Sequence, residues 1–313
     1  MKDVLVATWR NGLFALADMA FHEEWPGHSV SGLARDSSGN ALAIVDGKSL
    51  CRRTPVGAWH TIAHSEIELA CCVAVGADIY VGANNAAQVL RVRDDGSLER
   101  LFGFDHVPGQ ERWYAGTAVI DGRTVGPPLA IRSMSASCDG QAIFANVHVG
   151  GIPRSTDGGA TWQPTIDVDC DVHQVCAHPT RPEIVIAATG TGLGISRDGG
   201  DTWTIEHQGL HARYCSAVAF VGDDLLVAAS SDHFAQQGAI YRRPIDRGGP
   251  LLQVAGGLPQ WLDGIADTGN IAASGATVAV VDHGGTLYLS EDAGCTWSRH
   301  GEPLPTPSSI FVH

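Results

Sequence analysis

Short apolar runs of four or five residues recur along the whole chain, and turn residues such as glycine, aspartate, asparagine and serine separate them. Runs of this length, bounded by turn signals, are typical of β-strands, because a helix needs a longer stretch of helical periodicity. Seven of these runs recur at 36 to 47 residues, apart from one insertion, and each predicts the third strand of a repeated unit. The seven runs are 13–17, 49–53, 89–93, 152–155, 193–197, 239–243 and 286–290.

The clearest repeat is an eight-residue pattern, S-x-D-x-G-x-T-W, which occurs three times. It occupies residues 155–162, 196–203 and 290–297, so that successive copies begin 41 and then 94 residues apart. Because 94 is twice 47, a degenerate copy is expected midway, and the segment 243–248 falls there. A period in the forties, with strand-like runs inside each unit, predicts a β-propeller of four-stranded blades.

The aspartates of this pattern, Asp157, Asp198 and Asp292, have a structural explanation. An aspartate carboxylate accepts backbone N–H bonds across a tight turn, and glycine supplies the position with positive φ. The pattern resembles the Asp-box (BNR-repeat) propellers, a group that includes sialidases, sortilin-type receptors, xyloglucanases and photosystem II assembly factors. This resemblance implies the fold and a structural role for the three aspartates, and it leaves the function open.

The seven units predict an all-β fold in which residues 1–313 form one domain, a seven-bladed β-propeller. The first unit has no inner strand before it, and an unmatched strand at 308–313 follows the last unit. We therefore expect the C-terminal strand to close the ring as the inner strand of the first blade. Six blades are the alternative if the first two units are misread. An insertion at 104–130, between the third and fourth blades, is long enough to form a lid over the axis.

Composition narrows the range of partners. The formal net charge is −14, whereas sequence-independent binding to nucleic acid or anionic membranes needs clustered lysine and arginine. The first residues lack the pattern of a signal peptide, and the eight cysteines include no C-x-x-C pair and lie mostly in apolar runs. We therefore predict a cytoplasmic protein with reduced cysteines that binds a small molecule, with no nucleic-acid or membrane partner. The sequence does not indicate an oligomeric state.

Histidines gather in the loops at one end of the predicted propeller axis. These loops join the second and third strands of a blade, or lead into its inner strand. Because a buried imidazole must satisfy two nitrogens, several histidines at one end of the axis favour a transition-metal site. Asp171 or Asp232 would supply a carboxylate, and iron, copper, manganese, nickel and zinc all remain open. The predicted metal ligands are His148, His173, His211, His233 and His283.

Arginines and aromatic residues map to the same face. Arg10, Arg132 and Arg213 could hold a carboxylate bidentately, as arginines do in sialidases. The sequence departs from the sialidase pattern because no Arg-Ile-Pro segment precedes the first Asp box, and Tyr114 has no spaced carboxylate partner. The predicted catalytic residues are Asp171, Arg132, Arg213 and Tyr114. The predicted substrate contacts are Arg10, Trp25, Arg112, Trp113, Trp261 and Asp263.

Three functions are compatible with these residues. The first is a metal-dependent enzyme, a lyase, hydrolase or oxygenase, that acts on a small anionic or polyhydroxylated molecule. The second is a metal-free, glycan-active or glycan-binding propeller, in which carboxylates such as Asp169, Asp171 and Asp263 act as acid and base and tryptophans stack on sugar rings. The third is a non-catalytic assembly or scaffold propeller. The density of histidines at one face favours the first.

Overall fold

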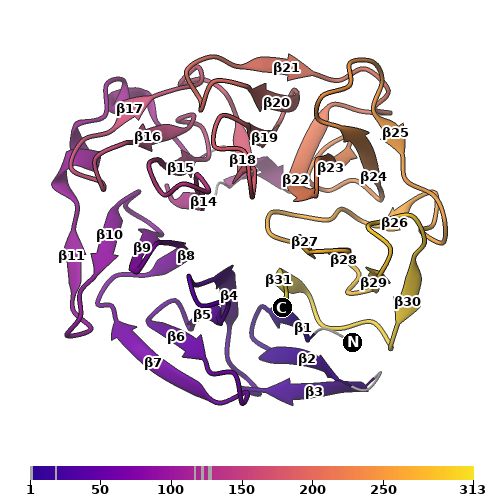
Figure 1. Cartoon of the computed structure of the whole chain (residues 1–313), viewed down its shortest axis with the longest axis horizontal. Coiled ribbons are helices and arrows are strands. Elements are labelled where there is room, and N and C mark those ends of the chain that lie inside the picture. The colour runs from indigo at the N-terminus through magenta and orange to yellow at the C-terminus, as the bar shows by residue number, and fades with distance from the viewer. Residues whose placement is uncertain (1–2, 18–19, 116–117, 121–122, 126–128) are drawn as a thin grey trace.

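Seven antiparallel sheets, the blades, are arranged around a central axis, with the first and last strands of the chain side by side (Figure 1). This computed structural model describes residues 3–17, 20–115, 118–120, 123–125 and 129–313. Each sheet has four strands that run from the axis to the rim, and the sixth has a fifth, short strand. The predicted seven-bladed β-propeller is therefore confirmed, and the six-bladed alternative is wrong.

In each of the first four blades, the strands follow one another in chain order from the axis to the rim, with β31 as the inner strand of blade 1. Blade 1 consists of β31 (Pro307–Val312), β1 (Val4–Thr8), β2 (Leu13–Ala17) and β3 (Ala20–Glu24). Blade 2 consists of β4 (Val30–Arg35), β5 (Ala41–Val45), β6 (Ser49–Arg53) and β7 (Trp59–His64). Blade 3 consists of β8 (Leu69–Val75), β9 (Asp78–Ala83), β10 (Val89–Val92) and β11 (Leu98–Arg100). Blade 4 consists of β14 (Ile131–Ala136), β15 (Ile143–Val147), β16 (Pro153–Ser155) and β17 (Gln163–Pro164).

The last three blades follow the same order. Blade 5 consists of β18 (Val172–Ala177), β19 (Val185–Thr189), β20 (Gly192–Ser196) and β21 (Thr204–Glu206). Blade 6 consists of β22 (Tyr214–Val221), β23 (Asp224–Ser230), β24 (Gln237–Pro244) and β25 (Leu252–Gln253), and β26 (Leu262–Asp263) also pairs with β24. Blade 7 consists of β27 (Ile271–Ser274), β28 (Thr277–Val281), β29 (Leu287–Ser290) and β30 (Ser298–His300).

The ring closes through the C-terminal strand, as predicted. Strand β31 pairs antiparallel with β1, and Val312 lies opposite Val4 while Ile310 lies opposite Val6. The C-terminal strand thus supplies the inner edge of a blade whose other three strands come from the N-terminus. This pairing covers the inner edge of β1 and completes the four strands of the first blade.

The three S-x-D-x-G-x-T-W segments fold into the same turn. In the first copy, Asp157 Oδ1 accepts the backbone N–H of Thr161 at 2.8 Å, and the Thr161 hydroxyl donates to Asp157 Oδ2 at 2.6 Å. Gly159 has φ +89°, which a residue with a side chain rarely adopts. Asp198 and Asp292 make the same bonds to Thr202 and Thr296. The structural role expected for the three aspartates follows from these contacts.

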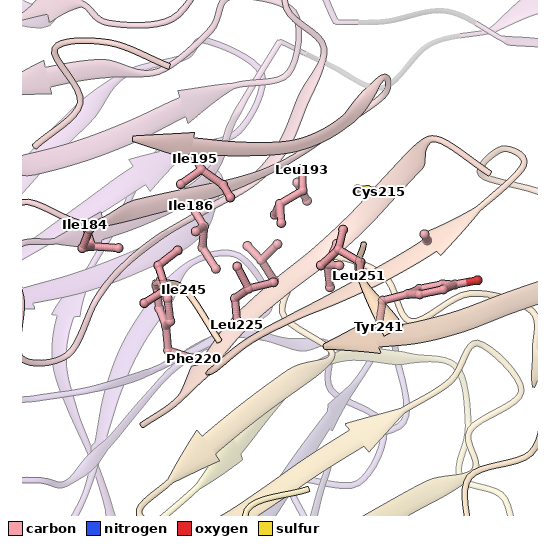
Figure 2. Close-up of a cluster of buried hydrophobic side chains, with 14 of the residues drawn as sticks. Ile184, Ile186, Leu193, Ile195, Cys215, Phe220, Leu225, Tyr241, Ile245 and Leu251 are labelled. Atoms are coloured by element: carbon pink, nitrogen blue, oxygen red, sulfur yellow. The ribbon is translucent and has the colours of Figure 1, made fainter. Parts of the chain in front are cut away.

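The hydrophobic core is divided among the interfaces between neighbouring blades. Figure 2 shows one such cluster, in which side chains of blade 5 such as Ile186 and Leu193 face Leu225 and Tyr241 of blade 6. Second strands such as β5, β15 and β19 are buried along their whole length, because both of their faces meet a neighbouring blade. This is why they appear in the sequence as continuous apolar runs.

The insertion at 104–130 begins by packing between blades 3 and 4. It contains part of η1 (Phe102–His106), η2 (Gln110–Arg112) and a two-stranded ribbon of β12 (Ala118–Ile120) and β13 (Arg123–Val125). Phe104 and Trp113 are buried against Trp162 of blade 4. Residues 116–117, 121–122 and 126–128 of the predicted lid lie outside the described residues.

The described helices are two short 3₁₀ turns, η1 and η2. No helix in the described ranges is long and apolar enough to cross a membrane.

Candidate functional site

A cavity of about 1170 Å³ occupies the axial end at which the sequence places its polar loops. Loops between second and third strands contribute Asp46, His148 and Asp232 to its wall, and loops leading into inner strands contribute Asp171 and Asp267. Both predicted classes of loop therefore meet in one cavity. This arrangement follows from the blade topology, which puts these two turns of every blade at the same end.

Bulges in the inner strands determine which side chains reach the axis. Val172 pairs with Thr189 and Gln174 with Ala188, so His173 is an extra residue in β18. In the preceding blade, Ile131 pairs with Val147 and Ser133 with Asn146, so Arg132 is the extra residue of β14. A bulged residue escapes the regular alternation of side chains between the two faces of a sheet. Arg132 and His173 therefore occupy matching positions in adjacent blades.

Three predicted residues converge at this point. His148 follows β15, Asp171 immediately precedes β18, and His173 lies one residue inside β18. Asp171 Oδ1 is 3.1 Å from His148 Nε2 and 3.2 Å from His173 Nε2. One ligand atom from each of the three residues lies within 4.8 Å of the other two, and no other such group of histidine, cysteine and acidic residues occurs in the described chain.

The orientation of His173 is fixed by its second nitrogen. His173 is fully buried, and its Nδ1 lies 2.5 Å from the backbone carbonyl of Cys215. A carbonyl only accepts, so Nδ1 donates to it. The backbone bond thus fixes the ring with Nε2 facing the Asp171 carboxylate.

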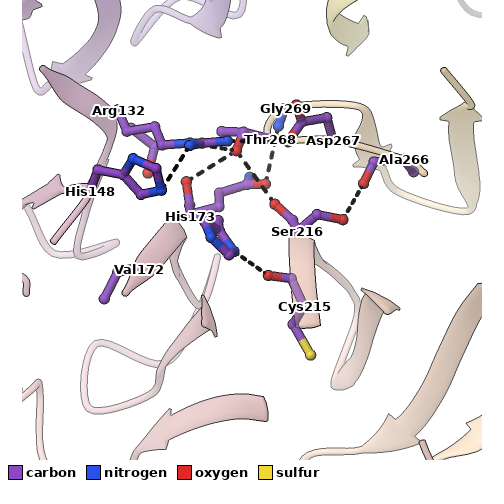
Figure 3. Close-up of polar contacts among 12 residues, drawn as sticks. Arg132, His148, Val172, His173, Cys215, Ser216, Ala266, Asp267, Thr268 and Gly269 are labelled. Carbon is purple, nitrogen blue, oxygen red and sulfur yellow. Dashed lines mark hydrogen bonds and ion pairs between the residues drawn. The ribbon is translucent and has the colours of Figure 1, made fainter. Parts of the chain in front are cut away.

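Arg132 contacts His148 Nε2 from the neighbouring inner strand (Figure 3). Arg132 Nη1 lies 3.3 Å from His148 Nε2, and because a guanidinium only donates, this nitrogen accepts. The other arms of Arg132 reach the entrance of blade 7, where Nε donates to Thr268 Oγ1 at 3.2 Å and Nη2 lies 3.3 Å from Asp267 Oδ1. Thr268 in turn donates to the backbone carbonyl of His173 at 3.1 Å.

The charges at the site reinforce this picture. Burial opposes ionisation of Asp171, but the two imidazoles beside it hold its pKa well below its ordinary range. Burial lowers the pKa of His148, an effect that Asp171 opposes and Arg132 assists. Burial also raises the pKa of Tyr214, whose ring centroid lies 4.5 Å from that of His173. The three converging atoms are one carboxylate oxygen and two imidazole nitrogens.

The other predicted histidines do not join this group. His233 lines the cavity. Burial raises the pKa of Asp267, but Arg132 and, more weakly, His233 lower it, and the net pKa lies below its ordinary value. His211 lies outside the cavity wall, where Nδ1 is 2.8 Å from the Tyr241 hydroxyl and its ring lies against Trp261. His283 is also absent from the wall. The expected five-histidine cluster is thus reduced to two histidines and one aspartate, since His211 and His283 lie outside the cavity wall and His233 is not within ligand distance of the group.

The predicted arginines and carboxylates are divided in the same way. Arg10 lines the cavity with Arg132, whereas Arg213 is exposed outside its wall, so no clamp of three arginines forms. Arg112 is also outside and pairs with Asp169. Asp263 is outside as well, in the short strand β26 of blade 6.

The three predicted stacking tryptophans are packed against protein instead. Trp113 is 8% exposed in the core, Trp25 lies 4.7 Å from Trp59 between ring centroids, and Trp261 packs against blade 6. None of the three lines the axial cavity, so the structure does not bring them together there as a platform for a ring substrate. The predicted Tyr114 does line the cavity and is half exposed. Two aromatic residues that the sequence analysis missed, Trp9 and Phe234, join it there with 52% and 60% exposure.

Asp267 and Thr268 are the main residues of the site that sequence analysis missed. They lie in the loop that leads into β27, whereas the prediction placed the start of that loop's polar segment at Trp261 and Asp263. No repeated sequence signal marks them, because Asp267 stands four residues before β27 whereas Asp171 stands one residue before β18.

No protein-family model matches the chain, and no curated protein matches it. Solved structures resemble it in fold. A GH74 enzyme of Niastella koreensis gives a TM-score of 0.61 at 15% identity over 96% of this chain and 47% of that one. A GH74 xyloglucanase from Xanthomonas campestris gives 0.58 at 16% identity with the same coverage. A nidogen/laminin complex gives 0.57 at 10% identity over 100% of this chain and 98% of that one. The chain thus spans about half of each GH74 chain, and these likenesses show a shared propeller fold.

Proposed function

We propose that this propeller is a metal-dependent enzyme whose divalent transition-metal ion is held by His148, Asp171 and His173 at the wall of the axial cavity. The observation that carries the proposal is the convergence of one carboxylate oxygen and two imidazole nitrogens, which lie 3.1 and 3.2 Å from that oxygen. Carboxylate oxygens and imidazole nitrogens are ligand types that transition-metal ions bind. Ligands about 2.1 Å from one metal ion lie roughly 3.0–3.5 Å apart, close to these distances.

The surroundings support a metal site in two further ways. The bond from His173 Nδ1 to the Cys215 carbonyl is the type of outer contact that orients metal-binding imidazoles. Two imidazoles and one carboxylate suit zinc, iron, manganese, nickel and copper, and they leave coordination positions open toward the cavity for a substrate. A metal in this position would polarise a substrate oxygen or lower the pKa of a bound water. Lyase, hydrolase and oxygenase chemistry all remain compatible.

The aspartate offers the sharpest test. Binding free energies of about 10–16 kcal/mol for four-ligand zinc sites correspond to about 2.5–4 kcal/mol per ligand, or roughly 10²–10³ in affinity. We expect Asp171→Asn to weaken Zn²⁺ binding by about that factor, measured by competition with a chromophoric chelator. Asp167→Asn is the matched control, because Asp167 is exposed in the same loop and its acceptor bond to the Asp169 N–H survives as an amide. Equal Zn²⁺ affinity of the two variants would refute the site.

A metal-free, glycan-active propeller is the second candidate. It is supported by the exposed Trp9, Tyr114 and Phe234 at the cavity and by the GH74 enzymes among the structural neighbours. On this alternative, Trp9→Ala abolishes binding of an oligosaccharide while removal of metal by a chelator has no effect. A ligand whose binding requires metal, and survives Trp9→Ala, supports the first candidate.

A further inference from the structure

Arg132 stands at the nitrogen that the proposed metal would use. Its Nη1 is 3.3 Å from His148 Nε2, which has one lone pair in the plane of the ring. The lone pair can accept a hydrogen bond from the guanidinium or bind a metal, but it cannot do both. The other nitrogen of His148, Nδ1, is buried and makes no hydrogen bond to any described residue. Metal binding through Nε2 therefore requires Arg132 Nη1 to leave.

The remaining contacts of Arg132 show where it would stay. Nε donates to Thr268 and Nη2 faces Asp267, both at the entrance of blade 7, whereas His148 belongs to blade 4. Ser216 anchors this loop, because its hydroxyl donates to the Ala266 carbonyl at 2.6 Å. Gly269 is held as well, since its N–H donates to Gln174 Oε1 at 3.1 Å. Loss of the His148 contact thus leaves the guanidinium fixed on one side and frees Nη1 on the cavity side.

We propose that metal binding displaces Arg132 from His148 and thereby creates an oxyanion-binding site, formed by Arg132 beside the metal, for an anionic substrate. The inference rests on the proposed function and narrows its substrate to a molecule with a carboxylate, sulfate or phosphate group. A planar guanidinium binds such groups through parallel N–H bonds. Without metal, Arg132 Nη1 donates to His148 Nε2. With metal, the charge of Arg132 becomes available to the substrate, so metal binds first and the anion second.

The first test asks whether one substitution strengthens or weakens Zn²⁺ binding. An arginine that competes for His148 opposes metal binding, so Arg132→Gln should tighten Zn²⁺ binding about 10-fold or more. Arg247→Gln makes the same change of net charge in an exposed turn and should leave the Zn²⁺ affinity unchanged. An unchanged or weakened affinity of Arg132→Gln overturns the inference while the metal site stands. Absence of Zn²⁺ binding in both the unsubstituted protein and Arg132→Gln overturns the proposed function as well.

The second test uses sulfate as the probe and the unsubstituted protein. Calorimetry should show sulfate binding about 10-fold tighter at saturating Zn²⁺ than without it, with the reciprocal effect of sulfate on Zn²⁺ affinity. Arg132→Gln should remove this gain, which separates the contribution of the arginine from that of the metal alone. If Arg132→Gln does not fold, nitrogen NMR of the unsubstituted protein decides. The inference expects His148 Nε2 to be unprotonated without metal and to shift on Zn²⁺ addition, and a protonated Nε2 contradicts it.

Discussion

Phe311 provides a direct measure of how much ring closure contributes to stability. It lies in β31, where Ile310 and Val312 face the interface of blades 7 and 1 while Phe311 faces the interface of blades 1 and 2. Phe311 is 5% exposed, and the Arg35 guanidinium lies 4.8 Å from its ring centroid. One strand thus joins three blades through alternate side chains.

The expected cost of Phe311→Ala is large on the scale of a folded protein. Truncation of a buried phenylalanine costs about 3–5 kcal/mol, because transfer free energy is lost and a cavity remains. The free energy of unfolding of a typical domain is about 5–15 kcal/mol. We therefore expect Phe311→Ala to remove a substantial share of the stability and to expose the β1 edge to proteases.

Urea unfolding, followed by tryptophan fluorescence and by circular dichroism, would measure this cost. Phe102→Ala is the matched control, since Phe102 is 65% exposed on η1 and its loss should cost about 0.5 kcal/mol or less. If both variants lose the same small amount, the blades are stable independently and the reasoning about ring closure is refuted.

Three further predictions concern the turns, the aromatic residues and the histidines. Hydrogen bonds from Thr296 and Ser290 lower the pKa of Asp292 to about 2 from its ordinary 3.8, so its ionised form stabilises the fold above about pH 4 and this contribution disappears as the pH falls toward 2. Asp292→Asn should therefore destabilise the protein at pH 7 more than at pH 2, and urea unfolding that shows an equal cost at both pH values would contradict this. Trp113→Ala should cost about 3–5 kcal/mol in the same assay, because the side chain is buried, whereas the half-exposed Trp9→Ala should cost about 0.5 kcal/mol or less. His211→Ala should lower the melting temperature and leave Zn²⁺ affinity unchanged, because His211 contacts Tyr241 and Trp261 instead of the metal site; a large loss of Zn²⁺ affinity would contradict that placement.

The fold could be predicted because each blade repeats the same local signals. The predicted third strand at 13–17 coincides with β2, and that at 193–197 differs by one residue from β20. Turns of the Asp157 type mark the boundary between third and outer strands in three blades, so even a partial repeat gives the period. Ring closure could be predicted by counting strands, since the unmatched strand at the C-terminus can fill the missing inner position of the first blade.

The candidate site could be predicted only as far as the topology determines it. The sequence assigns His148, His173, His211 and His283 to two kinds of loop, those between second and third strands and those leading into inner strands, which lie at one end of the propeller. In the structure all four occur in such loops or at the adjoining strand ends. Their distance from the axis depends on loop length and on packing between blades, which no local pattern encodes. His211 stays outward because Tyr241 and Trp261 hold it.

The bulges explain why the polar groups meet at this particular place. Arg132, His173 and Ser216 are the extra residues of β14, β18 and β22, in three consecutive blades. The same backbone device therefore presents a cation, an imidazole and a hydroxyl at matching positions, and each performs a different task. His173 faces Asp171, Arg132 bonds to His148, and Ser216 anchors the loop whose Asp267 holds Arg132. Because bulges re-aim side chains without altering the rest of a blade, the residues at these three positions can change the chemistry of the axial end while the propeller fold is kept.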